Sequence, residues 1–298
     1  LFRSPERPTP VFLSAPGPCR TSATPPIAGA QVRHDQHPWS HHAESFAALS
    51  LGQTDFSALR RSGAVYVDKT DLIFRLAGED AGRIFLTRPK GFGKTLLLST
   101  IESLFRHGLR DFQGLAVEGL WTDRTYDVLR LDFGTLGPFA SAEDFSTAFD
   151  ALITAAADDA GLEIPRDAGG PIARLAKWIA AREDASLVLL IDDYDAPFLR
   201  AWKDEKLFAE AEAQLGRFYA YLKSMEEKFR FLFITGTTRV TGAWLTSPMN
   251  GLQDVTFDPA YAALAGFTED EFETAFRVRL NRRSEEHTSE LQSPYDLV

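Results

Sequence analysis

A polar loop in the first third of the chain carries residue types that bind phosphate. It reads Arg88-Pro89-Lys90-Gly91-Phe92-Gly93-Lys94-Thr95 and lies between an apolar run at 83–87 and the helical sequence that begins at Leu96. In such a loop the backbone N–H groups surround phosphate oxygens, the lysine supplies a positive charge and the threonine hydroxyl is a ligand for Mg²⁺. We therefore predict that a phosphate-bearing cofactor is held by Arg88, Pro89, Lys90, Gly91, Phe92, Gly93, Lys94 and Thr95, with Thr95 also on the metal.

One residue of this loop departs from the usual phosphate-binding pattern. The pattern G-x-x-x-x-G-K-[ST] has a glycine where this chain has Arg88. A Gly-Lys-Thr sequence is common by chance, so the alternative is an incidental match. The apolar strand before the loop and the helix after it favour the functional interpretation.

Two carboxylates follow an apolar run later in the chain. Leu187-Val188-Leu189-Leu190-Ile191 ends in Asp192-Asp193, which is the form of a Walker B strand. Because ligands of open α/β sheets bind at the carboxyl ends of the strands, we expect Asp192 to enter the Mg²⁺ shell beside Lys94. Asp193 is then placed to polarise an attacking water. The alternative is an ordinary turn, since strands of α/β proteins often end in a solvated Asp.

A third polar group closes the apolar run at 229–235. The run ends in Thr235, and Gly236-Thr237-Thr238-Arg239 follow it. A polar residue at this place can hold the lytic water or sense the γ-phosphate, and an arginine can neutralise charge that develops there. A solvent-facing loop arginine is the alternative for Arg239. The predicted catalytic residues are Asp193, Lys94, Thr235 and Arg239.

These groups need a scaffold that brings the ends of several strands together. Short apolar runs alternate with segments of helical period, which is the signature of a parallel α/β sheet. Thr268 and Glu271 have the spacing of a capping box, which predicts a final helix through about residue 279. The sequence predicts strands at 83–87, 128–133, 187–191, 229–235 and 254–257, and earlier helices at 71–78, 95–107, 143–157, 171–183 and 205–227.

The composition is that of a soluble globular protein. Of the 298 residues, 44% are hydrophobic and 25% are charged, which is enough for a large core. A net charge of −10 argues against a broad electrostatic surface for nucleic acid or an anionic membrane. Cys19 is the only cysteine, and no apolar run is long enough to span a bilayer. We therefore expect a reducing, cytoplasmic setting.

Both ends of the chain are expected to lie outside the folded domain. Residues 1–45 hold half of the 16 prolines and lack an apolar stretch of signal-peptide length, which predicts a disordered leader. Residues 283–298 resemble the translation of a sequencing-adapter oligonucleotide and are expected not to be native. The predicted domain covers 46–282, in a chain that looks like a fragment because it begins with Leu1 rather than methionine.

Several segments in fixed order are together more specific than any one of them. They are Tyr66-Val67-Asp68-Lys69-Thr70, Arg88 through Thr95, Leu131-Asp132-Phe133, Ile191-Asp192-Asp193-Tyr194-Asp195, Phe233-Ile234-Thr235-Gly236, and Asp258-Pro259-Ala260-Tyr261 with Gly266-Phe267-Thr268. In this combination the chain resembles the bacterial AAA-ATPase-like family of P-loop proteins over about 56–276. Members of that family also carry arginine in place of the first glycine, so the resemblance makes Arg88 compatible with nucleotide binding.

The resemblance implies a fold, a ligand and a partner. The fold is the α/β three-layer sandwich of P-loop NTPases, whose mainly parallel sheet is of the additional-strand type, with the sensor strand between the Walker A and Walker B strands. The ligand is ATP with Mg²⁺, and a PD-(D/E)xK nuclease-like domain often follows. Two residues depart from the family: Asp193 stands where glutamate is usual, and Ala196 where lysine is common.

Three functions are compatible with these residues. The leading hypothesis is an ATP-binding and ATP-hydrolysing domain, an ATP phosphohydrolase, that powers or gates an attached effector domain. The second is a nucleotide-dependent switch or binding module with negligible hydrolysis, which Arg88 and Asp193 suggest. The third is a protein-interaction scaffold with a vestigial phosphate loop. The sequence predicts neither a membrane contact nor a direct nucleic-acid contact.

Overall fold

The computed structural model describes residues 52–78, 82–165, 169–240 and 251–277. The expected leader at 1–45 and the expected read-through tail at 283–298 lie outside these ranges.

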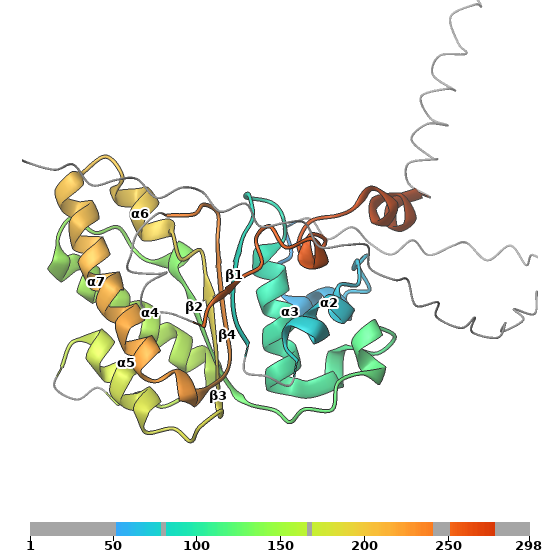
Figure 1. Ribbon diagram of the computed structural model, residues 1–298, viewed down its shortest axis with the longest axis horizontal. Helices are drawn as coiled ribbons and strands as arrows, with labels where there is room; N and C mark the ends of the chain where they lie inside the picture. Colours follow the sequence, from blue (N-terminus) through green and yellow to red (C-terminus); the bar gives the residue numbers. More distant parts are fainter. Residues whose placement is uncertain (1–51, 79–81, 166–168, 241–250, 278–298) are drawn as a thin grey trace, which may run out of the picture. The chain divides into compact units, whose positions relative to one another are not determined.

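The centre of the fold is a parallel sheet whose strand order places the predicted loops side by side. In the described residues it contains β1 (Gly82–Thr87), β2 (Asp127–Asp132), β3 (Leu187–Asp192), β4 (Phe229–Gly236) and β5 (Gln253–Asp254), in the order β2-β3-β4-β1-β5. Every pairing is parallel. Strand β4 lies between β1, which leads into the phosphate loop, and β3, which ends in the paired carboxylates (Figure 1). The predicted additional-strand topology is confirmed.

Helices cover both faces of the sheet and complete three layers (Figure 1). One face packs against α1 (Phe56–Arg61), α2 (Thr70–Leu76) and α3 (Lys94–His107), and the other against α4 (Ala142–Ala160), α5 (Pro171–Ala180), α6 (Ala196–Ala201) and α7 (Glu205–Ser224). A further helix occupies 269–277. Short 3₁₀ turns lie at Gly108–Asp111, Ala116–Gly119, Phe133–Thr135, Glu226–Lys228 and Pro259–Tyr261.

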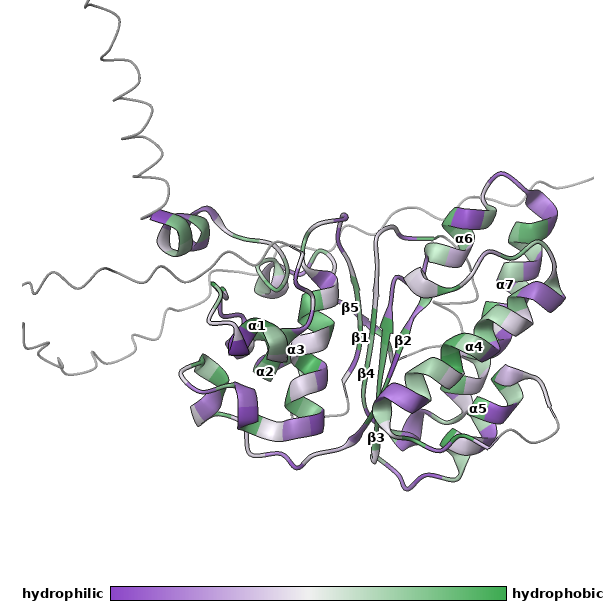
Figure 2. Cartoon of the chain, turned by 180° about the vertical axis from the view of Figure 1, so that it is seen from behind, coloured by the Kyte–Doolittle hydropathy of each residue, from purple (hydrophilic) through white to green (hydrophobic). Residues whose placement is uncertain are grey.

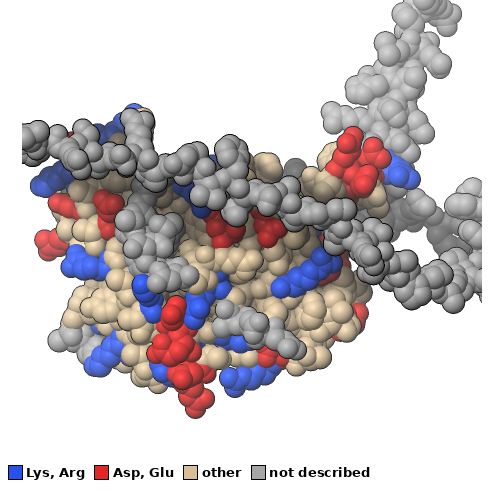
Figure 3. Space-filling view, in the orientation of Figure 1, with Lys and Arg blue, Asp and Glu red and all other residues tan. Residues whose placement is uncertain are grey.

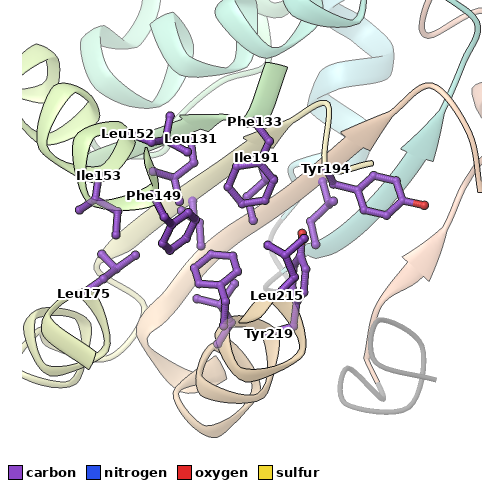
Figure 4. Packing of buried hydrophobic residues seen from close by; sticks show 14 of the residues in the cluster. Leu131, Phe133, Phe149, Leu152, Ile153, Leu175, Ile191, Tyr194, Leu215 and Tyr219 are labelled. Atoms are coloured by element: carbon purple, nitrogen blue, oxygen red, sulfur yellow. The ribbon is translucent and has the colours of Figure 1, made fainter. Parts of the chain in front are cut away.

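Two apolar clusters, one on each side of the sheet, hold these layers together. Strand β3 is buried along its whole length, as expected for a central parallel strand. Its odd-numbered side chains join the cluster under α4 to α7, where Ile191 packs near Phe149 and Leu215 (Figure 4), and Val188 and Leu190 join the cluster under α3. The sheet and the inner sides of the helices are the hydrophobic parts of the fold (Figure 2).

The stripe predicted on the helix at 205–227 packs on this protein's own sheet. Ala211, Leu215, Phe218 and Leu222 of α7 are buried in the cluster around β3. The helix ends at Ser224, slightly earlier than predicted, because a 3₁₀ turn at Glu226–Lys228 leads directly into β4. Packing within the domain therefore accounts for the stripe.

The structure corrects the prediction in two places. The strand predicted at 254–257 covers only Gln253–Asp254. It ends there because the N–H of Thr87 on β1 donates to the side-chain hydroxyl of Thr256, at 3.1 Å, instead of to a backbone carbonyl of a continuing strand. The six-residue helices α1 and α6 were not predicted, since so short a segment contains less than two turns of the helical period.

Candidate functional site

The loop between β1 and α3 has the backbone shape that the glycines predicted. Gly91 and Gly93 adopt φ angles of 84° and 80°, which residues with a side chain rarely adopt, and Gly93 immediately precedes the first turn of α3. The first backbone N–H groups of a helix have no partner within the helix, and they carry the positive end of its dipole. The start of α3 is therefore suited to bind an anion.

Lys94 is folded back over this loop. Its side chain is buried, and its ammonium donates to the carbonyl oxygens of Arg88 at 3.0 Å and Pro89 at 3.3 Å. A buried ammonium held only by carbonyl oxygens keeps its positive charge available to an anion inside the loop. Thr95 follows it in the first turn of α3 and is partly exposed, so its hydroxyl can reach a ligand at the same place.

The Arg88 side chain contacts the part of the chain that follows β5. Its guanidinium donates to the carbonyl oxygens of Thr256 at 2.6 Å and Tyr261 at 3.3 Å, and also to that of Thr87. Burial lowers the pKa of Arg88, and the charge of Asp254 partly offsets that effect. The residue that replaces the first glycine of the pattern is thus bonded to the chain that follows β5.

Asp192 lies at the carboxyl end of β3 with one oxygen available. Its side chain is 1% exposed, and its Oδ1 accepts from the Thr235 hydroxyl at 2.7 Å and from the Asp193 N–H at 3.1 Å. Its Oδ2 lies 3.6 Å from the Arg130 guanidinium but accepts no hydrogen bond from the described residues. A buried carboxylate oxygen without a hydrogen bond is the donor that a hard cation requires, so the residues present fit a Mg²⁺ ligand at this place.

The described residues contain no group of three or more His, Cys, Asp or Glu that could hold a metal ion by themselves. Mg²⁺ usually takes one or two protein ligands and completes its shell with water and substrate phosphate. Asp192 and Thr95 are the two protein ligands that the sequence predicted.

Asp193 is held in an uncommon backbone conformation beside a pocket. Its φ of 47° is positive, as for few residues other than glycine. Burial raises the pKa of the Asp193 carboxyl, and the charge of Asp192 raises it further, while the charge of Lys94 lowers it. Asp193 lines the same pocket as Lys90, so the end of β3 lies close to the phosphate loop. A carboxyl with a raised pKa is a better proton acceptor once it is ionised.

The pocket at this end of the sheet has a volume of about 220 Å³. It is lined by Lys90 from the phosphate loop, Gly134 after β2, Asp193, Asp195, Ala196, Leu199 and Arg200 after β3, and Thr237 after β4. Gly134 leaves room for the carboxylates, since a Cβ at that position would lie 3.0 Å from Asp193 Oδ2 and 2.8 Å from Asp132 Oδ1. Three strand ends and the phosphate loop thus meet at one pocket.

The other two predicted catalytic residues have partners of their own. Thr235 is fully buried and donates its hydroxyl to Asp192, so it directly orients that carboxylate. Arg239 forms an ion pair with Asp254 of β5 and is half exposed. The structure therefore brings Asp192, Asp193 and Thr235 together, and the phosphate loop that carries Lys94 reaches the same pocket as Asp193. The Arg239 side chain is directed toward β5.

Three further residues organise the site and were given no role from the sequence. Asp195 is buried and accepts from the N–H groups of Thr237 and Thr238, at 3.0 and 2.7 Å. The hydroxyl of Tyr194 donates to the carbonyl of Thr238 at 2.9 Å. Arg200 donates to the carbonyls of Gly134 and Leu136. Tyr194 and Asp195 belong to a motif that carries the family resemblance, but the contact partners became visible only in the fold.

These contacts place the site where parallel α/β sheets bind their ligands, and the comparison with known proteins agrees. A family model described as predicted AAA-ATPase matches residues 50–246. The chain belongs to this AAA-ATPase-like family. The match includes the phosphate loop, the Asp192-Asp193 pair and Thr235, so membership supports nucleotide binding through a P-loop.

A curated relative of the chain has no assigned activity. It is an uncharacterized protein in the vnfD 5′ region of Azotobacter chroococcum mcd 1, 30% identical over 235 residues, which are 78% of this chain and 45% of the relative. The chain therefore spans less than half the length of this relative. No solved structure matches the chain. In the described part of the chain, no helix is both long enough and apolar enough to cross a bilayer.

Proposed function

We propose that this AAA-ATPase-like chain binds ATP with Mg²⁺ in the loop from Arg88 to Thr95 and hydrolyses it, and that the reaction powers or gates an effector domain of the full-length protein. The observation that carries the proposal is the meeting of the phosphate loop with the carboxylates that follow β3. Lys90 of the loop and Asp193 line the same pocket, and the neighbouring Asp192 has a buried oxygen that accepts no hydrogen bond from the described residues.

Each of these residues has a defined part in the proposed reaction. Lys94 would exchange its two carbonyl partners for β- and γ-phosphate oxygens. The backbone N–H groups at the start of α3 would donate to other phosphate oxygens. Thr95 and Asp192 would hold Mg²⁺, which neutralises phosphate charge when it is bound. Thr235 keeps Asp192 in its orientation, and Asp193 would accept a proton from the attacking water.

The location of Asp193 also supports a second candidate, a nucleotide-dependent switch with negligible hydrolysis. The family usually has glutamate at this position, and aspartate is shorter by one methylene. A base must come within about 2.6–3.2 Å of the proton donor or act through a further water, so a shorter side chain slows the reaction. Release of inorganic phosphate from ATP distinguishes the two candidates.

The effector part of the proposal is supported by the length of the relative, more than half of which lies outside the match. A nuclease-like domain is the attached effector that the family resemblance suggests. Mass spectrometry of DNA or RNA incubated with the full-length protein and ATP would test for such an activity.

Binding calorimetry with Lys94→Ala tests the nucleotide site. We expect the wild-type chain to bind Mg²⁺-ADP, and the variant to bind it at least tenfold more weakly, because the charge that faces the β-phosphate is lost. Lys223→Ala serves as the matched control, since Lys223 lies near the far end of α7, and its affinity should equal that of the wild type. An unchanged affinity in Lys94→Ala would place the nucleotide elsewhere.

A further inference from the structure

A segment far along the chain runs against the phosphate loop. Residues 255–271, here called the latch segment, follow β5, the strand that pairs with β1 at the edge of the sheet (Figure 1). The N–H of Val255 donates to the Phe85 carbonyl at 2.9 Å, and the Thr256 hydroxyl accepts from the N–H of Thr87 at 3.1 Å. The last residues of β1 before the loop are therefore bonded to the latch segment.

Arg88 continues this contact with its side chain. Its guanidinium donates to the main-chain oxygens of Thr256 and Tyr261, two points of the latch segment, while its own N–H donates to the Gly236 carbonyl at 3.1 Å. Arg88, at the start of the phosphate loop, is thus hydrogen-bonded both to β4 and to the latch segment. A glycine at this position would keep only the main-chain bond.

The tip of the phosphate loop is bonded to the same segment. The N–H of Gly266 donates to the Phe92 carbonyl at 2.8 Å. Gly266 has φ +88°, and a Cβ there would lie 3.0 Å from the Phe92 ring, so only glycine fits both the backbone and the close approach. The first residue and the tip of the loop are therefore both fixed from the same side.

The far end of the latch segment is fixed to the opposite end of the domain sequence. Buried Lys69, just before α2, forms an ion pair with Glu271. Glu271 also accepts from the N–H of Thr268 at 2.8 Å, and the Thr268 hydroxyl accepts from the N–H of Glu271, which completes the predicted capping box. Acidic side chains gather on the helix at 269–277 that starts here (Figure 3).

We propose that Arg88 is a positioning residue that holds the phosphate loop against the latch segment, so that nucleotide binding and docking of the latch segment stabilise each other. The nucleotide half of this statement rests on the proposed function. Because a coupling free energy is reciprocal, whatever tightens the latch segment tightens nucleotide binding, and bound nucleotide tightens the latch segment.

This proposal reverses the expectation from the motif. Arg88→Gly would complete the pattern G-x-x-x-x-G-K-[ST], and by the motif alone it should preserve or improve nucleotide binding. In the structure, however, Arg88→Gly removes both side-chain hydrogen bonds to the latch segment. It also increases the backbone conformational freedom of the loop, because glycine has no side chain. We therefore expect Arg88→Gly to weaken binding of Mg²⁺-ADP about tenfold, and Arg88→Lys to recover part of that loss.

Hydrogen exchange of the backbone amides in 256–266, read together with ADP affinity, tests the proposal. In the wild-type chain, Mg²⁺-ADP should slow exchange in this segment. In Arg88→Gly the segment should exchange faster without nucleotide, and ADP should change the rate less. If Arg88→Gly binds ADP as tightly as the wild type and its 256–266 amides are equally protected, the proposal is overturned.

A second pair of variants leaves Arg88 intact. Gly266→Ala places a methyl group against Phe92. Gly114→Ala introduces the same kind of backbone strain, at φ +76°, but its methyl group would have no atom of the described residues within 4 Å apart from its chain neighbours. Gly266→Ala should weaken ADP binding and speed exchange at 256–266, and Gly114→Ala should do neither. Equal ADP affinity and equal exchange at 256–266 in the two variants would contradict the coupling.

Failure of the proposed function gives a different result. A wild-type chain that binds no ADP would contradict the proposed function, while faster exchange in nucleotide-free Arg88→Gly would still show that Arg88 holds the latch segment.

Discussion

At the scale of single residues, the site combines several carboxylates whose negative charges repel one another when no ligand is bound. Asp193 has a positive φ and shares its surroundings with Asp192, Asp132 and Asp195, whose charges all raise its pKa after burial has done so. Strained residues and clustered like charges persist where the surrounding structure enforces them, and they concentrate at functional sites. This arrangement favours a cation and an anionic ligand, which would neutralise the carboxylates and Lys94 together.

Substitutions of Asp193 separate its chemical role from nucleotide binding. Asp193→Asn should abolish ATP turnover, since an amide accepts no proton from water, and Asp193→Glu should raise turnover by extending the reach of the carboxylate. Asp193→Glu should not tighten nucleotide binding, because its effect lies in the transition state. Steady-state phosphate release measures the rates, with Asp158→Asn at the exposed end of α4 as the control. Turnover by Asp193→Asn at the wild-type rate would remove Asp193 from the mechanism.

At the scale of elements, the sheet order decides which loops meet. Because β4 lies between β1 and β3, Thr235 reaches Asp192, and the turn after β4 contacts Asp195 and Tyr194. The strands and long helices were predictable, since runs such as 187–191 and stripes such as that of α7 have a clear period. The direction of the Arg88 and Arg239 side chains was not, because it depends on carbonyl and carboxylate partners on β5 and the latch segment, which are distant in sequence.

The ion pair of Glu271 with Lys69 predicts a pH dependence of the latch segment. Burial raises the pKa of Glu271, but hydrogen bonds from Lys69 and Thr268 outweigh it and hold the pKa below its usual value. A carboxyl with a lowered pKa in the folded state contributes stability above its unfolded value of about 4.3, and this contribution is lost as the pH falls through the folded value.

Glu271→Gln should therefore destabilise the protein at pH 7, by about 1 kcal/mol for a partly exposed pair. The difference from the wild type should shrink as the pH falls below about 4.3 and disappear once the pH is below the lowered pKa of the folded carboxyl, where the wild-type group is protonated as well. Urea unfolding at several pH values measures it, with Glu143→Gln, in the exposed first turn of α4, as the control. A difference that stays constant between pH 7 and pH 3 would show that the ion pair is not its source.

At the scale of the whole molecule, the described elements form one continuous domain that the family match covers in large part. The match at 50–246 includes β1 to β4, and the latch segment extends the fold beyond it. The predicted domain bounds of 46–282 stay a prediction, since 1–45 and 283–298 lie outside the described residues.

Deletion of residues 283–298 should leave the melting temperature unchanged, because the sequence predicts that these residues are not native and do not contribute to the core. Deletion of residues 1–45 should be similarly mild. Differential scanning calorimetry of the shortened chains against the full chain checks both. A decrease of more than a few degrees on removal of 283–298 would show that this segment belongs to the folded protein.

The central claim is that Lys94 and the carboxylates at the end of β3 form one ATP-hydrolysing site. Single-turnover phosphate release from ATP, with the protein in excess and with Mg²⁺ present, tests it most directly. We predict slow release by the wild-type chain that depends on Mg²⁺, and release at the uncatalysed rate by Lys94→Ala and by Asp193→Asn. Equal release by the wild type and Lys94→Ala would contradict the claim, whether both rates are measurable or both equal that of ATP alone.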